Sequence, residues 1–434
     1  MLRLRRGSRL QKNVSPLRIT RLNMRWHQAL QTLLLLSAPA LFADTIEAGR
    51  DIEDNDIRAL KEWIDTKRQI SLKEIGGDLS LSGEVRTEFQ SAWEKRNGRD
   101  IRGSNPLQLP PRGFDIEFNF MLDFRTDRTW ASVKLEFDDD MGIFSGTLDK
   151  IALERAYWGV RPIQCDTYTF DIEIGRRSMS SIFDSKVMFG SFFDGVLFRY
   201  DRAFEKVGDY YLRLGAFIIN DRRDHFGYVG EMGLLNIAGT GFYGKFSTIA
   251  WDTRSYPESF VNDRFNFIVS QLTAGYRFRI ESIKKIGIFY SAFLYNWEAR
   301  KLDVSDFKRA PWGFYAGMSI GQLLRQWDWA FDLNYQIVLA QAFPDFDCSG
   351  SSLGNGDRSG FYTRFIRPLA GGGPSTVETA AGTTNYHGYI FRFDLLLTDK
   401  LDMQQLFLQS WTWDKDIGPR RSYTRYEIEF IYSW

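Results

Sequence analysis

The fold is decided by a stretch in which apolar and polar residues alternate: residues 114 to 125 read FDIEFNFMLDFR. Successive side chains of a β-strand point to opposite faces, so one face of this stretch is wholly apolar and the other is mostly polar. The same period-two pattern recurs from Leu79 to Trp434, for example over residues 327 to 339. Apolar faces this rich in Phe, Trp and Tyr favour a lipid-facing surface over the packed interior of a soluble sandwich.

Sixteen segments carry this alternation. The predicted strands are 79–90, 114–125, 129–138, 149–161, 168–176, 193–201, 207–220, 228–237, 242–253, 264–280, 285–298, 312–321, 327–341, 386–397, 401–412 and 421–434. Short connections such as 126–128 interleave with long ones such as 342–385. This arrangement predicts an all-β fold, an antiparallel transmembrane β-barrel of 16 strands, or of 18 if residues 361–369 form an extra hairpin. Every proline after residue 43 falls between the predicted segments, as strand ladders require.

The first 43 residues have the layout of a secretory signal peptide, with Met24 as an alternative start. They hold eight basic residues, no acidic one, and an apolar run that ends at Ala43. Removing them leaves 48 of the 56 basic residues against 55 acidic ones, a net charge of −7, which argues against a nucleic-acid partner. No later stretch approaches the roughly 20 apolar residues of a membrane helix.

Residues 44–76 precede the barrel domain, which we assign to 77–434. Within them, 45–70 has a helical pattern, with Asn55 as N-cap and an apolar stripe that includes Leu60. We expect a short helix at the periplasmic mouth. A structural cap is the favoured role, and a gate, a plug or an oligomerising arm are the alternatives.

Two features carry a family resemblance. The last strand resembles the C-terminal signal of Gram-negative outer-membrane proteins, which the barrel assembly machinery recognises; its aromatic and apolar residues share one face: Tyr426, Ile428, Phe430, Tyr432 and Trp434. The order IEIGRR (172–177), a loop, then FDGVLFRY (193–200) is similar to porins and to alginate-export-type barrels. The resemblance implies an outer-membrane location in contact with lipid. It leaves a homotrimer, as porins often form, and a single barrel both open.

In porins the loop between the fifth and sixth strands folds into the lumen and sets the constriction, and here the 177–193 loop takes that place. We therefore expect the constriction to be lined by the charged residues of this loop and of the strands that follow it: Arg177, Asp184, Lys186, Asp194, Arg199 and Arg213. Further lumen charges are expected on the polar faces of other strands: Glu84, Arg86, Asp115, Glu117, Arg277, Arg279, Arg392 and Arg425. Carboxylates on one arc and guanidiniums on another predict a transverse field. Lumen charges paired across neighbouring strands are the alternative.

The predicted function is passive diffusion of small polar or charged solutes through a water-filled lumen, with no cofactor and no metal. A substrate-specific, alginate-export-type barrel that exports polysaccharide is the alternative, and a structural, adhesive or enzymatic barrel is less favoured. An enzyme is disfavoured because only His225 and His387 follow residue 43 and no nucleophile elbow or metal-binding spacing occurs. Cys165 and Cys348 are expected at opposite rims, about 25 Å apart, too far for a disulfide.

Overall fold

The computed structural model describes most of the predicted barrel. The described residues are 70–72, 77–103, 109, 111–141, 150–189, 192–220, 225–251, 267–299, 301, 309–344, 347–351, 364–367, 376–379, 384–415 and 420–434. The predicted signal peptide and the predicted helix up to residue 69 lie outside this set. Ile70–Leu72, the first described residues, form a short strand, β1, which pairs with β2. Within the described part of the chain no helix is long and apolar enough to span a membrane.

Sixteen long strands build one sheet. They are β2 (Asp78–Arg96), β4 (Arg112–Arg125), β5 (Thr129–Asp140), β6 (Lys150–Gln164), β7 (Tyr168–Ser178), β8 (Phe192–Phe204), β9 (Gly208–Asn220), β10 (His225–Leu235), β11 (Phe242–Trp251), β12 (Phe267–Ile280), β13 (Lys285–Asn296), β14 (Trp312–Gly321), β15 (Trp329–Val338), β18 (Tyr386–Thr398), β19 (Leu401–Thr412) and β20 (Arg421–Ser433). Each predicted segment corresponds to one of these strands, with ends that differ by a few residues. The prediction of an all-β barrel is confirmed.

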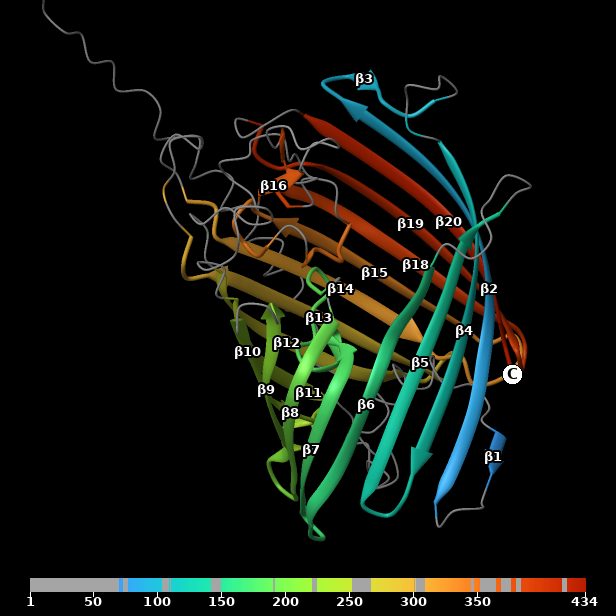
Figure 1. Cartoon of the computed structure of the whole chain (residues 1–434), viewed down its shortest axis with the longest axis vertical. Helices are drawn as coiled ribbons and strands as arrows, with labels where there is room; N and C mark the ends of the chain where they lie inside the picture. Colours follow the sequence, from blue (N-terminus) through green and yellow to red (C-terminus); the bar gives the residue numbers. More distant parts are fainter. Residues whose placement is uncertain are drawn as a thin grey trace, which may run out of the picture. The chain divides into compact units, whose positions relative to one another are not determined.

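The sheet closes on itself because β20, the last strand, pairs antiparallel with β2 as well as with β19 (Figure 1). Closure leaves no unpaired edge, which is the condition for a sheet to lie in lipid. The remaining strands lie outside this ring. β3 (Arg99–Asp100) extends the end of β2, and β16 (Arg364–Arg367) pairs only with β17 (Thr376–Thr379). The strand number is therefore 16 and not 18.

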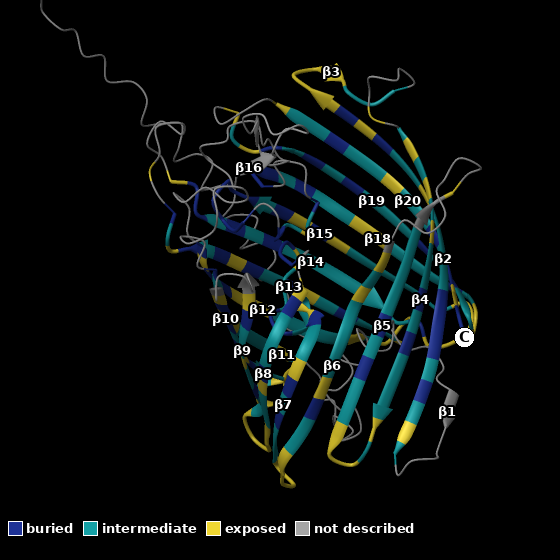
Figure 2. Ribbon diagram, viewed as in Figure 1, coloured by how far each residue is buried: buried dark blue, intermediate teal, exposed yellow. Residues whose placement is uncertain are grey.

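The two faces of the sheet differ as the alternation predicts (Figure 2). On β15, Leu333 and Tyr335 are 44% and 41% exposed, whereas their neighbours Asn334 and Gln336 are 4% and 0% exposed. The apolar residues thus point away from the barrel and the polar ones into it. An outward apolar face of this kind suits contact with lipid.

Two irregularities in β6 break the simple alternation. A bulge opposite Lys134 and Leu135 places Glu154 beside Lys134, while Arg155 is the register partner of Lys134, so two consecutive residues point inward. Pro162 lies inside β6, where the pairing with β7 shifts between Val160 and Ile163. The expectation that every proline falls between strands is wrong at this position, because a bulge accepts a residue that cannot donate to the ladder.

The seam between the first and last barrel strands is held at its end by Trp434. Its backbone N–H donates to the Gly83 carbonyl at 3.0 Å, and the Gly83 N–H donates back at 3.2 Å. The indole ring covers Gly83 so closely that a Cβ at that position would lie 2.5 Å from a ring carbon. Gly83 therefore provides the space in which the terminal aromatic side chain seals the barrel.

Candidate functional site

The loop after the fifth barrel strand folds into the lumen. We call residues 179–189, which follow β7 and open with the 3-10 turn Met179–Ser181, the constriction loop. Its apolar side chains are almost completely buried: Met179, Ile182, Phe183, Val187, Met188 and Phe189. They form one cluster with inward side chains of the barrel wall, among them Phe217, Ile249, Val269, Leu294 and Tyr315. Burial of this many apolar groups fixes the loop against one side of the wall.

Asp184 is the first polar anchor of the loop. Its carboxylate lies 3.0 Å from Lys245 Nζ on β11, and its backbone N–H donates to the Glu231 carboxylate on β10 at 2.9 Å. Its carbonyl accepts a hydrogen bond of 2.6 Å from Gln271 on β12. Three successive strands thus hold one residue, so its carboxylate has a fixed position.

Lys186 is the second anchor. Its Nζ lies 3.4 Å from an Asp332 carboxylate oxygen on β15 and 5.1 Å from the centre of the Tyr290 ring on β13. Its carbonyl accepts a hydrogen bond of 3.2 Å from Gln336. The side chain remains 44% exposed, so the ammonium group is accessible to water.

A second inward segment lies on the constriction loop, and the sequence analysis missed it. Residues 339–351 follow β15; Phe343 in this segment is fully buried, and the Phe189 N–H donates to the Asp347 carbonyl at 2.7 Å. Cys348 forms a β-bridge with Met188. Cys348 was expected on the outer rim, but it packs inside because the buried apolar residues Ala340, Ala342 and Phe343 continue past the strand end. Cys165 is exposed in the turn between β6 and β7, as expected.

Arginines dominate the inward face of β6 to β9, which we call the basic arc. Arg177 and Arg199 both bind the Glu173 carboxylate, the second at 2.9 Å. Arg161 makes a two-pronged contact with Asp171, and Arg213 donates to the Ser181 carbonyl of the constriction loop at 2.8 Å. The residues of this arc that point into the lumen also include Arg155.

Carboxylates dominate the inward face of β2, β4, β5 and β20, which we call the acidic arc. Glu429, Glu88 and Asp115 are direct cross-strand partners in one row. The next row aligns Arg86, Glu117 and Asp138, and Arg86 contacts Glu84 and lies 3.7 Å from Glu117 and 3.6 Å from Glu429. Like charges directly opposite each other destabilise a sheet, so this arrangement is explained by a water-filled, functional surface better than by stability.

Four further predicted lumen arginines lie on inward faces but in different surroundings. Arg392 contacts Gln404 and lies 3.3 Å from Asp394, and Arg425 lies 3.2 Å from Glu427, so both are placed among carboxylates. Arg277 and Arg279 lie near the short-turn end of β12, where Arg279 is exposed beside Glu281. The later arginines thus do not gather with the basic arc.

Asp194 does not line the lumen. It is the register partner of Arg176 on β7 and forms a two-pronged ion pair with it at 2.7 Å. Its neighbours Phe193 and Leu197 are each 1% exposed, whereas Phe198, on the face of Asp194, is 41% exposed. Strand alternation therefore places Asp194 on the outward face, and its assignment to the constriction was wrong.

Comparisons with known proteins come from structure alone. No protein-family model and no curated protein matches the chain. A high-pH structure of Pseudomonas putida OprB matches 88% of this chain and 97% of its own, at 9% identity and a TM-score of 0.49. Salmonella typhi OmpF in complex with daunomycin matches 84% of this chain and 100% of its own, at 9% identity and a TM-score of 0.46. A mutant porin of Rh. blastica matches 82% of this chain and 100% of its own, at 10% identity and a TM-score of 0.40. These similarities carry no argument about function, and the assignment of a closed, 16-stranded antiparallel barrel rests on the chain's own strand pairing.

Proposed function

We propose that the protein is an outer-membrane porin through which small polar or charged solutes diffuse passively. The observation that carries the proposal is the constriction loop, which is fixed to the inner wall of a closed barrel by buried apolar residues and by Asp184 and Lys186. A loop held on one side narrows a 16-stranded lumen without being part of the wall. On the facing acidic arc, Glu88, Asp115 and Glu117 are only partly buried, which is consistent with a water-filled passage.

The charge pattern supports a preference for cations. On the acidic arc, Glu88, Asp115 and Glu429 form one row, and Arg86 lies beside them among Glu84 and Glu117. In the basic arc, by contrast, the Glu173 and Asp171 carboxylates bind Arg161, Arg177 and Arg199 and so compensate part of the positive charge there. A row of carboxylates along an open wall attracts cations and repels anions.

The experiment that tests the proposal is single-channel recording of the purified, heat-modifiable barrel in a planar lipid bilayer. We expect stepwise conductance without added substrate. In a salt gradient, we expect a reversal potential whose sign indicates selectivity for cations over anions. Absence of conductance from folded protein would indicate a plugged, structural barrel. Conductance that appears only after one solute is added would favour the substrate-specific alternative.

A further inference from the structure

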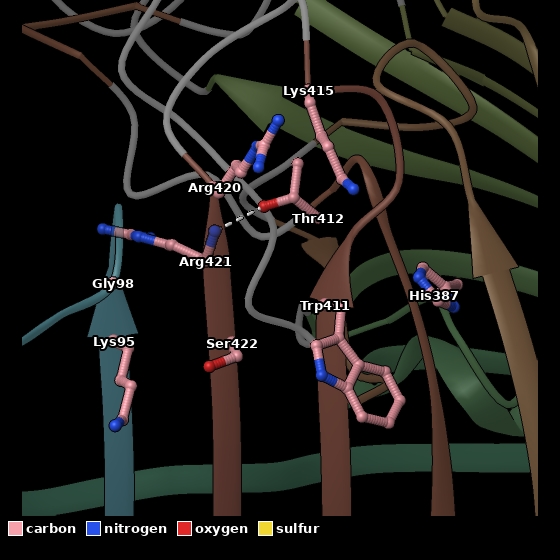
Figure 3. Close-up of a pocket in the computed structure, with 9 residues that line it drawn as sticks. All are labelled: Lys95, Gly98, His387, Trp411, Thr412, Lys415, Arg420, Arg421 and Ser422. Atoms are coloured by element: carbon pink, nitrogen blue, oxygen red, sulfur yellow. Dashed lines mark hydrogen bonds between the residues drawn. The ribbon is translucent and has the colours of Figure 1, made fainter.

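A depression lies at the long-loop end of β18, β19, β20 and β2, and Figure 3 shows the residues that line it. It has a volume of about 510 Å³. Its lining combines several basic side chains with an indole and an imidazole ring: Lys95, Gly98, His387, Trp411, Thr412, Lys415, Arg420, Arg421 and Ser422. None of these lining residues is acidic.

Strand register shows that one row of this lining faces outward, whereas Thr412 and Arg421 lie on the other face of their strands at the rim. Lys95 pairs with Ser422, Ser422 with Trp411, and Trp411 with His387, so the four residues form one row across four strands. Residues that are direct partners share a face. Lys95 lies on the same face of β2 as Trp93, which is 55% exposed. The row therefore belongs to the apolar exterior and not to the pore.

The residue types on the outer face change from row to row as the strands run away from the long loops. Two residues further along each strand, roughly 7 Å away, Trp93, Thr424, Gln409, Tyr389 and Tyr335 form the next row. The row after that is more apolar and contains Tyr426, Phe407, Phe391 and Leu333. Tyr and Trp between a rim that carries basic residues and an apolar row are typical of the level at which lipid headgroups meet acyl chains.

The basic side chains differ in how firmly they are held. Arg421 lies 3.7 Å from Glu94, whose side chain is 4% exposed, so Arg421 is part of the wall. Lys95 lies 3.5 Å from Asp100 with both side chains more than half exposed, and such a contact contributes little. Lys415 and Arg420 are exposed, and no described carboxylate lies within ion-pairing distance of either. Lys95, Lys415 and Arg420 are thus accessible cations on the lining of one depression.

We propose that this depression binds the phosphorylated headgroup of a lipid in the leaflet that meets the long loops, with Lys95, Lys415 and Arg420 contacting the phosphate. Charge complementarity selects an anion, and Arg is suited to a phosphate because its guanidinium can donate two parallel hydrogen bonds. The apolar rows below the site select a lipid over free phosphate, because they offer a surface for the attached acyl chains. The inference rests on the proposed membrane insertion but not on solute passage.

Native mass spectrometry of the purified full-length barrel with bisphosphorylated lipid A tests the proposal. In the variant Lys95→Ala/Lys415→Ala/Arg420→Ala we expect binding to weaken by about tenfold or more, since each basic residue near an anionic lipid contributes separately. The single variants should each show part of the loss. The matched control Arg128→Ala/Lys206→Ala/Arg325→Ala removes the same charge from exposed short turns at the other rim and should bind as the unaltered protein does.

Three outcomes would overturn the proposal: unchanged binding in the triple variant, equal binding of dephosphorylated lipid A to the unaltered protein, or displacement of lipid A by inorganic phosphate at comparable concentration. The last would indicate an anion site without a lipid requirement. Heat-modifiability and conductance, measured on the same samples, establish folding. Loss of conductance in the unaltered protein would contradict the porin proposal while leaving the lipid measurement intact.

Discussion

The two sides of the lumen wall are built from different kinds of polar residue. On the side covered by the constriction loop, β9 to β15, the buried inward residues include Ser247, Gln271 and Gln336, each 0% exposed and uncharged. On the open side, β2, β4, β5 and β20, the inward residues are mainly carboxylates such as Glu88 and Asp115. Neutral side chains satisfy the backbone of a buried loop without the cost of burying a charge, whereas charges remain where water can solvate them.

Among the described residues of β9 to β15, Glu231 is the charged residue in the fully buried class, and its partners explain it. This carboxylate is 2% exposed and accepts hydrogen bonds from the Asp184 N–H at 2.9 Å, the Tyr211 hydroxyl at 2.7 Å and the Ser247 hydroxyl at 2.7 Å. A buried charge is tolerated when several donors surround it. The covered side is thus a packed interior, and the open side is a solvated surface.

The largest expected effect concerns the open side, which contains the closing seam. Trp434→Ser removes the ring that covers Gly83, and we expect the heat-modifiable barrel to be lost from the outer membrane while secretion across the inner membrane continues. Immunoblots of unheated membrane fractions measure this. Phe293→Ser, which removes an outward aromatic ring from the covered side, is the control and should assemble. Normal levels of folded Trp434→Ser protein would show that the seam does not need this side chain.

The next effect concerns the covered side. Phe183→Ser replaces a fully buried loop residue whose ring lies 4.8 Å from that of Phe189, and loss of a buried Phe typically costs about 3–5 kcal/mol. We expect the loop to detach, the barrel to remain folded and single-channel conductance to rise severalfold. Phe192→Ser, at an outward position beside the loop, should leave conductance unchanged. An unchanged conductance in Phe183→Ser would mean that the loop does not limit the pore.

Charge substitutions should show how much each side of the wall contributes to ion selectivity. Lys186→Glu combined with Arg213→Glu adds negative charge at the constriction, and the reversal potential in a salt gradient should shift toward cations. Glu88→Gln combined with Glu429→Gln removes negative charge from the open wall, and the reversal potential should then shift toward anion selectivity. If the first pair has no effect while the second does, the constriction loop lies outside the ion path.

The smallest effect is expected from the cysteines. Cys348 contacts Met188 on the covered side, and Cys165 lies in an exposed turn. Mass spectrometry of non-reduced peptides should find no bridge between them. A thiol reagent should modify Cys165 readily and Cys348 more slowly, because Cys348 is partly buried. Equal rates would show that the 339–351 segment leaves the lumen, and a bridge between the two would contradict the strand order.

The barrel could be predicted from the sequence because period-two alternation is a local signal repeated in every strand. The closed ring, the strand number and the inward side of Glu84 or Arg199 all follow from it. The position of the constriction loop after the fifth strand was predicted from the family resemblance. The contacts that Asp184 and Lys186 make with the wall were not predicted. Those contacts join residues far apart in the sequence, for example Lys186 with Asp332, and no local pattern encodes such a pairing.

The errors have local physical causes. Asp194 was placed in the lumen because it lies near the loop, but its register with Arg176 puts both on the outside. Glu154 and Arg155 share the inward side through a bulge, which a strict alternation excludes. The 339–351 segment was missed because it has no periodicity, although its apolar residues Ala340, Ala342 and Phe343 are a signal for burial.

The constriction loop also has a mechanical consequence. Its polar contacts reach β9 through Arg213, β12 through Gln271 and β15 through Lys186, so it ties these distant strands together across the inside of the wall. Among the described residues, the acidic arc is held by its own strand ladders and side-chain ion pairs. The barrel should therefore be stiff on one side and compliant on the other, and sideways pressure in the bilayer would flatten the compliant side first and narrow the lumen from there.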